Sequence, residues 1–127
     1  MARVEGMCRE VIDAAEWIAI ATAGPDGPHV VATWGDYVRA LGVGGDTLVI
    51  PVGHMHKTEA NLQSDSRVEL LCGTRQVQGA HGPGKGCSLV GTAQVQAAGP
   101  QFEAVKARFP WARAALVVHV EEARPQL

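Results

Sequence analysis

Residues 51–62, PVGHMHKTEANL, hold the side chains of this sequence that are best suited to bind an anion. An apolar stretch ends at Gly53, and the pair Lys57-Thr58 follows at the start of a predicted short helix. The first turn of a helix has backbone N–H groups without intrahelical partners and carries the positive end of the helix dipole. Because Lys57 adds a positive charge and Thr58 a hydroxyl donor, this pattern indicates a phosphate site.

Asn61 lies one helical turn after Lys57, where its side-chain amide is placed to donate to the same anion. Each charge-assisted hydrogen bond would contribute about 1.5–3 kcal/mol if water is partly excluded. The alternative is an ordinary exposed first turn without a ligand, because these residue types suit such a turn equally well. The residues alone leave both interpretations open.

A second candidate for phosphate binding is the glycine-rich stretch GAHGPGKG at residues 79–86. It nearly matches the nucleotide P-loop, but Gly86 lacks the hydroxyl that would bind magnesium, and a strand rather than a helix is predicted to follow. Hydrolysis of nucleoside triphosphates is therefore not expected. The glycines instead suit either a loop whose backbone approaches a flat ligand or a flexible hairpin loop.

Aromatic side chains stand near the ends of the predicted strands. Trp34 ends one strand close to Tyr37, and Trp111 precedes the last strand. Aromatic residues in such places can flank a planar ring, although core or interface positions are the alternative. Trp17, at the end of the first predicted helix, is expected in the core.

The remaining reactive side chains predict no catalytic centre. His54 and His56 form an H-x-H pair, but without a third ligand they make a weak metal site, and no metal is expected. No acid–base pair or nucleophile stands out. Cys8, Cys72 and Cys87 are odd in number and lack zinc-binding spacing, so we expect reduced thiols in a cytoplasmic protein.

Charge and hydropathy exclude two classes of partner. The formal net charge is −2, with Lys and Arg scattered singly, so no basic surface for nucleic acid is expected. No stretch resembles a signal peptide or approaches the roughly 20 apolar residues of a membrane span. The length of 127 residues fits a single domain over residues 1–127.

Six strands must position these residues. Turn signals and apolar spacing predict them at residues 18–22, 29–34, 47–52, 68–77, 87–97 and 114–120. Helices are predicted over 7–17 and 101–108, the latter with Phe102, Val105 and Phe109 on one face. This order favours a small antiparallel barrel decorated by helices, whose closure would remove exposed strand edges. Because so short a barrel leaves part of its core open, we expect a homodimer.

Four stretches together resemble a known family: GPHVVATW, VIPVGHMHKTEAN, GPGKG and FEAVKARFPWARAALVV. They are similar to the small FMN-binding proteins of sulfate-reducing bacteria, within the FMN-binding split-barrel superfamily that also contains pyridoxamine 5′-phosphate oxidase. The resemblance covers nearly the whole chain. It implies a mainly β fold, a six-stranded antiparallel split β-barrel of Greek-key type with short flanking helices, in a dimer with one FMN per barrel.

The resemblance also implies which residues hold FMN. Lys57, Thr58 and Asn61 would bind the phosphate. The ring would meet two strand ends, two aromatic side chains and the glycine loop, namely Ala32, Thr33, Trp34, Pro51, Val52, Gly53, Tyr37, Trp111, Gly82, Pro83 and Gly84.

Two positions depart from the family pattern. His54 stands where the motif has a second small residue, and Ala32 where it has an asparagine. The titratable His54 would alter access to the cofactor or its redox tuning, and Ala32 offers no side-chain contact. The C-terminal Leu127 belongs either to a frayed tail or to a segment that reaches the partner's site.

Three functions are consistent with the sequence. The first is an FMN protein that carries electrons between redox proteins. The second is a flavin reductase or oxidase that uses NAD(P)H or a small substrate, which the lack of a dinucleotide fingerprint disfavours. The third is a barrel without flavin that serves as a binding module.

Overall fold

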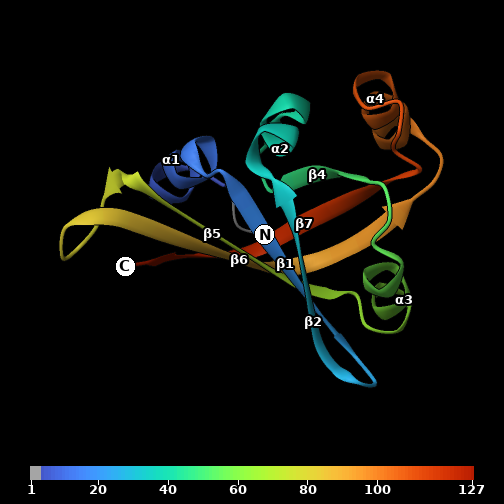
Figure 1. The fold of residues 1–127 in the computed structure, drawn as a ribbon, viewed down its shortest axis with the longest axis horizontal. Helices are drawn as coiled ribbons and strands as arrows, with labels where there is room; N and C mark the ends of the chain where they lie inside the picture. Colours follow the sequence, from blue (N-terminus) through green and yellow to red (C-terminus); the bar gives the residue numbers. More distant parts are fainter. Residues whose placement is uncertain (1–3) are drawn as a thin grey trace.

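Seven antiparallel strands form one curved sheet with four helices around it (Figure 1). The computed structural model describes residues 4–127. The sheet order is β2-β1-β5-β6-β7-β4-β3. In chain order the elements are α1 (Gly6–Ala14), β1 (Trp17–Gly24), β2 (Gly27–Trp34), α2 (Gly35–Leu41), β3 (Val43–Gly44), β4 (Thr47–Val52), α3 (His56–Ser64), β5 (Arg67–Gln78), β6 (Pro83–Gln96), α4 (Pro100–Arg108) and β7 (Ala114–Gln126).

The inner face of the sheet carries the core. In β1, Ile18 and Ile20 are buried and alternate with partly exposed alanines, as the two-residue period of a strand requires. Ile18 pairs with Cys72 and Ile20 with Leu70 of β5, so both strands turn their apolar side chains to the same face. The alternation therefore leaves a second, outer face exposed on β2, β1 and β5.

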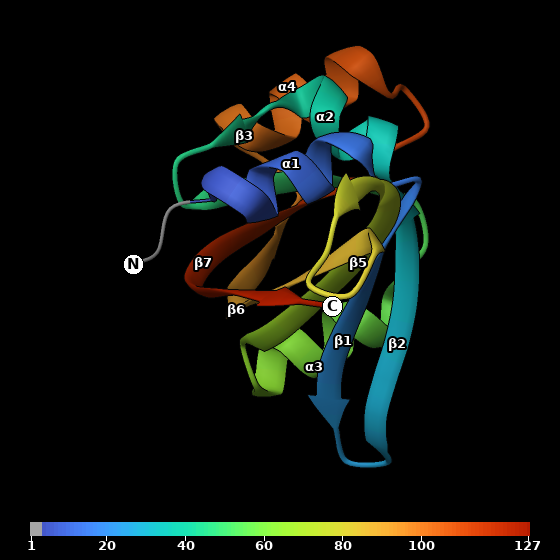
Figure 2. The same cartoon turned by 90° about the vertical axis from the view of Figure 1, so that its left-hand side faces the viewer.

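The helices cover the inner face and the ends of the sheet. The helix α1 packs against β5 and β6 and buries Val11 and Ile12 (Figure 2). The helix α4 packs against β7 and β4, and Phe102, Val105 and Phe109 share one apolar cluster, which confirms the face predicted for this helix. Among residues 4–127, no helix combines the length and the apolar character that a membrane crossing requires.

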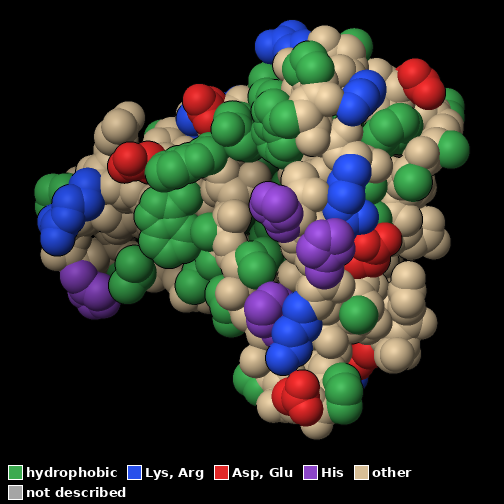
Figure 3. All heavy atoms as spheres, turned by 45° about the vertical axis from the view of Figure 1, so that its right-hand side comes forward, with side chains coloured by type: hydrophobic (Ala, Val, Ile, Leu, Met, Phe, Trp, Pro, Cys, Tyr) green, Lys and Arg blue, Asp and Glu red, His purple; other side chains and the backbone are tan. Residues whose placement is uncertain are grey.

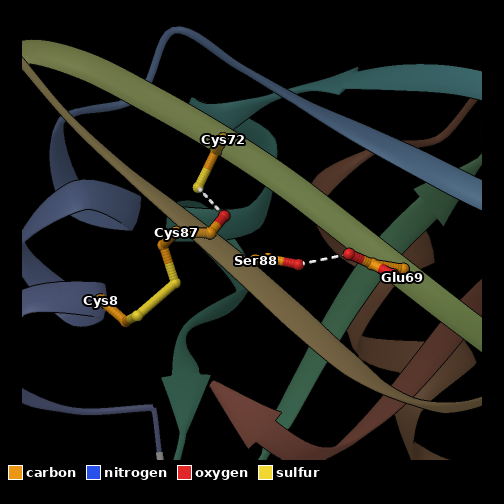
Figure 4. Close-up of a disulfide and its surroundings, with 5 residues drawn as sticks. All are labelled: Cys8, Glu69, Cys72, Cys87 and Ser88. Carbon is orange, nitrogen blue, oxygen red and sulfur yellow. Dashed lines mark hydrogen bonds between the residues drawn. A yellow bond between two sulfur atoms is a disulfide. The ribbon is translucent and has the colours of Figure 1, made fainter. Parts of the chain in front are cut away.

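The cysteines are not three reduced thiols. Cys8 of α1 and Cys87 of β6 form a disulfide with a Cα–Cα distance of 5.3 Å, and only Cys72 is free (Figure 4). The prediction failed because the chain separates the two paired residues by 79 positions, and only the packing of α1 on β6 brings them together. The expectation of a cytoplasmic protein thereby loses its support from the cysteines. Burial raises the pKa of the Cys72 thiol to about 11, so this thiol is protonated at neutral pH.

The predicted fold class is confirmed with one small difference. All six predicted strands are present, and the seventh is the two-residue β3, which pairs only with β4. The helix α2 was also missed, because its sequence GDYVRAL begins with glycine and its seven residues are too few for a clear periodic signal. Trp17 is not in the core: it opens β1 and is 53% exposed.

Candidate functional site

The helix α3 begins where the sequence indicated an anion site. Met55 precedes it in a left-handed conformation, with φ of 55°, and no side chain caps the first turn. Thr58 is 1% exposed, and its Oγ1 is the buried side-chain polar atom within residues 4–127 that finds no hydrogen-bond partner. A buried hydroxyl without a partner is costly. An anion at the start of α3 would satisfy Thr58 together with the free backbone N–H groups of the first turn.

Lys57 lies at the rim of this site. Its Nζ is 3.4 Å from Asp26 Oδ2 in the turn between β1 and β2. The side chains are 48% and 78% exposed, so the pair is weak and easily broken. Lys57 is therefore available to an incoming anion.

Asn61 has a packing role, and its predicted contact with the phosphate stays a prediction. Its Nδ2 donates to Thr22 Oγ1 of β1 at 3.1 Å, and its amide lies directly against the backbone of Gly24. A side chain at position 24 would collide with that amide. Asn61 thus fixes α3 against the β1–β2 hairpin.

Gly53 brings Trp111 close to the start of α3. A Cβ atom at position 53 would lie 3.2 Å from the Trp111 ring, so glycine permits the indole to rest against this backbone. Trp111 is 51% exposed and stands in the turn between α4 and β7. Lys106 of α4 donates to the carbonyl oxygens of Pro110 and Ala112, one on each side of Trp111, and so holds that turn in place.

Tyr37, Phe109 and Trp111 form an aromatic cluster beside Gly53. The centroid of the Tyr37 ring is 4.9 Å from that of Phe109 and 5.6 Å from that of Trp111. Two of the aromatic residues predicted to flank a planar ring, Tyr37 and Trp111, are therefore in contact. The sequence did not suggest that Phe109 supports both of them.

A second group lies on the outer face of β1 and β2. Trp17 and Trp34 are partners in the strand register, and with Ala32 and Thr33 they line a pocket of about 400 Å³. Trp34 also lines the neighbouring pocket with Tyr37, which links this group to the aromatic cluster. Trp17 lines this pocket, although the sequence analysis expected it in the core. The signal was present, since buried Ile18 and Ile20 put residue 17 on the opposite face.

Pro51 and Val52 offer only their backbones, because both side chains are buried at the end of β4. The stretch from Gly82 to Gly84 lies elsewhere, at the turn between β5 and β6. Figure 1 places this turn at the opposite end of the molecule from α3. Within one chain these glycines do not join the other predicted site residues.

Histidine and basic side chains gather on the face that Figure 3 shows, beside a band of apolar side chains. His54 and His56 lie close together, with ring centroids 6.2 Å apart. Within residues 4–127, no three side chains of the His, Cys, Asp or Glu types are grouped as metal ligands. Arg113, which the sequence analysis did not single out, holds the loop that carries His54.

Comparison of the chain with known proteins identifies its family. The family model for pyridoxamine 5′-phosphate oxidase matches residues 4–126. The FMN-binding protein of Nitratidesulfovibrio vulgaris (strain DSM 19637 / Miyazaki F) is 52% identical over 110 residues, which are 87% of this chain and 88% of that protein.

Solved structures agree on the fold. A HupZ variant from Group A Streptococcus has a TM-score of 0.71 at 18% identity and covers 97% of this chain and 99% of its own. A putative pyridoxamine 5′-phosphate oxidase from Lactobacillus delbrueckii has a TM-score of 0.68 at 16% identity, over 98% and 99% of the two chains.

Together these findings define a split-barrel protein, with a candidate anion site at the start of α3 and aromatic side chains near it. The chain belongs to the pyridoxamine 5′-phosphate oxidase family.

Proposed function

We propose that the chain binds FMN, with the phosphate at the start of α3 and the ring against the strand ends and the aromatic residues. The single observation that carries this proposal is the buried Thr58 hydroxyl without a partner, which lies one position after the accessible Lys57. The 52% identical relative is itself called an FMN-binding protein, which supports the choice of FMN among phosphate ligands.

The protein's own residues would bind and orient the cofactor. Lys57, Thr58 and the first-turn N–H groups hold the phosphate, and Asn61 fixes the helix that presents them. Ala32, Thr33 and Gly53 offer backbone to the ring, and Trp34 with Trp111 would flank it. FMN supplies electron transfer when bound, and the protein sets its surroundings. Two tryptophans so close to the flavin would quench its fluorescence.

Electron transfer between redox proteins is the role that the site supports best. With the ring against the exposed Trp111, one edge of the flavin would lie at the molecular surface, where a partner protein could approach. The alternative is a flavin reductase or oxidase that takes hydride from NAD(P)H or a small substrate. The observation in its favour is that the family is named after an enzyme, pyridoxamine 5′-phosphate oxidase. The cytoplasm remains our prediction for its location, without support from the cysteines.

A homodimer is part of the same proposal. The outer face, defined here by the exposed or half-exposed side chains of Trp17, Ala19, Val30, Ala32, Trp34 and Leu71, is apolar over three neighbouring strands. Exposed apolar patches of this kind mark protein contacts. A second copy on this face would cover it next to the proposed ring site.

In a dimer, the stretch Gly82–Gly84 could contact the site of the second copy. This turn lies far from α3 in its own chain but stands at the end of a long β5–β6 hairpin that extends from the sheet (Figure 1). We propose that the hairpin turn borders the FMN of the second copy. Leu127 lies beside this turn, because its carbonyl oxygen accepts a hydrogen bond from the backbone N–H of Ala80, so it would reach the same partner site.

Flavin titration tests the proposal. Purified protein is expected to be yellow, and the apoprotein to bind FMN more tightly than riboflavin, which has the same ring without the phosphate. Folded apoprotein that binds neither flavin would refute FMN binding. Stopped-flow reduction by NADH, compared with reduction by a small redox protein, separates the carrier from the enzyme.

A further inference from the structure

Arg113, in the segment just before β7, contacts the end of β4, the loop that follows it and the first turn of α3. Its backbone N–H donates to Val52 O at 2.8 Å, and its Nε donates to Gly53 O at 2.9 Å. A terminal nitrogen donates to His54 O, and the other lies 2.9 Å from a carboxylate oxygen of Glu59. One guanidinium group therefore connects the ring end of the candidate site to its phosphate end.

The loop that Arg113 holds has an uncommon backbone. Met55 adopts a left-handed conformation that costs a non-glycine residue free energy. The two carbonyl groups immediately before Met55 are those of Gly53 and His54, and both point at Arg113. A carbonyl oxygen turned toward the start of α3 would repel an anion, and the hydrogen bonds to Arg113 keep both oxygens occupied.

Glu59 gives Arg113 a second task. This carboxylate lies in the first turn of α3, one residue after Thr58, where a negative charge opposes a bound phosphate. Its ion pair with Arg113 offsets that charge. Lysine has a single nitrogen and cannot contact two carbonyl groups and a carboxylate with the fixed fork of an arginine.

We propose that Arg113 is a positioning residue for the phosphate of FMN. It orients the loop before α3 and neutralises Glu59, so that the first turn of α3 presents donors and no uncompensated negative charge. This inference rests on the proposed FMN function, and Arg113 itself does not need to touch the cofactor.

The test compares the affinities for FMN and riboflavin in Arg113→Gln. Glutamine is polar but lacks the positive charge and the forked N–H donors of the arginine side chain. The affinity for FMN is expected to fall by about tenfold or more, the equivalent of roughly 1.4 kcal/mol, while the affinity for riboflavin falls by a clearly smaller factor. The reason is that, within residues 4–127, Gly53 is the one contact of the Arg113 side chain at the ring. A purely structural role would weaken both flavins alike, so the ratio of the two affinities is the informative readout.

Two further variants separate the tasks of Arg113. Glu59→Gln keeps the bonds to both carbonyl groups and removes the negative charge, so its preference for FMN is expected to equal or exceed that of the parent. The double variant Arg113→Gln/Glu59→Gln has no uncompensated charge at position 59. Its affinity for FMN is therefore expected to recover in part from the low value of Arg113→Gln. Arg113→Lys keeps the positive charge but loses the forked guanidinium group. Its ratio of FMN affinity to riboflavin affinity is expected to lie between those of the parent and Arg113→Gln.

The outcomes are distinct. An Arg113→Gln protein that melts like the parent and keeps the parent's ratio of affinities overturns the inference, as does an equal loss for both flavins. If Arg113→Gln does not fold, the same ratio of FMN to riboflavin affinity is measured in Arg113→Lys, and an unchanged ratio there overturns the inference. A parent protein that binds FMN no better than riboflavin contradicts the proposed phosphate site instead, whatever the Arg113 variants do.

Discussion

Thr58 buries a hydroxyl that has no hydrogen-bond partner within residues 4–127. Such a group lowers the stability of the folded apoprotein by about 1–3 kcal/mol. In a phosphate site the same hydroxyl becomes a donor to a charged oxygen. Thr58 is therefore expected to act in opposite directions on stability and on ligand binding.

Thr58→Val removes the hydroxyl with little change of shape. We expect the free energy of unfolding of the apoprotein to rise by about 1 kcal/mol, because the desolvated donor is gone, while FMN binding weakens by about 1.5–3 kcal/mol. Denaturant unfolding and flavin titration measure the two effects. A variant that loses stability and binds FMN as before would show that Thr58 does not face the phosphate.

Lys57→Ala removes the accessible cation at the rim of the site. We expect FMN binding to weaken by roughly 1.5–3 kcal/mol, with riboflavin binding unchanged, because only FMN carries the phosphate. Asp26→Asn is the matched control: it frees Lys57 from an exposed partner, so FMN binding should stay the same or tighten slightly. Equal dissociation constants for the parent and Lys57→Ala would contradict the phosphate assignment.

At the scale of residues, the sequence predicted local structure better than long-range contacts. It predicted a helix that begins near Lys57 and Thr58, which the structure has, while phosphate binding there stays a prediction. Arg113 was missed because it lies 54 or more positions along the chain from each residue it contacts through its side chain, as the residue numbers show. Arg113 stands inside the family stretch FEAVKARFPWARAALVV, but the sequence does not show which residues its side chain contacts.

At the scale of elements, the disulfide between Cys8 and Cys87 joins α1 to the centre of the sheet. A loop closed over 79 positions gives a large loss of entropy in the unfolded chain. Removing the disulfide is expected to lower the free energy of unfolding by about 4 kcal/mol. The effect should be confined to stability, because α1 does not carry any of the proposed flavin contacts.

Denaturant unfolding with and without a thiol reductant measures this contribution. The variant Cys8→Ala/Cys87→Ala is the control, since a reductant should not change its unfolding further. Parent protein whose unfolding midpoint is the same in both conditions would show that the disulfide does not form in solution. The free thiol of Cys72 is buried and protonated, so it should remain slow to react in the folded protein at neutral pH.

The elements that the sequence predicted best are those with a strong period. The strand β1 and the helix α4 repeat their apolar residues at two and at three to four positions, so both were found close to their observed bounds. The helix α2 and the strand β3 are held mainly by tertiary contacts, α2 against β4 and β3 as an edge partner of β4. Local propensity does not report such contacts, so these two elements could not be predicted from the sequence.

At the scale of the whole molecule, one face of the sheet remains apolar and exposed. Leu71 is 45% exposed in β5 and lies opposite Ala19 of β1 and Ser88 of β6. The side chain of Ser88 donates to Glu69, so a polar pair borders this apolar area. Apolar strands with a polar border are the composition expected of a subunit contact.

Leu71→Glu is expected to convert the proposed dimer to monomer. A second copy would force the new carboxylate into the contact next to the existing Glu69, and an unpaired buried charge there raises the dissociation constant of the dimer by about 100-fold or more. Sedimentation velocity measures the change. Met7→Glu is the matched control, because Met7 is also an exposed apolar residue but lies on α1, which covers the inner face of the sheet.

The same variant links assembly to the cofactor. If the hairpin turn at Gly82–Gly84 borders the ring of the second copy, Leu71→Glu should weaken FMN binding as well as the dimer, and riboflavin binding should fall by the same factor, because the hairpin would contact the ring and not the phosphate. Lys57→Ala gives the opposite pattern, a loss for FMN alone in a protein that remains dimeric. A monomeric Leu71→Glu that binds both flavins like the parent would place the whole site within one chain.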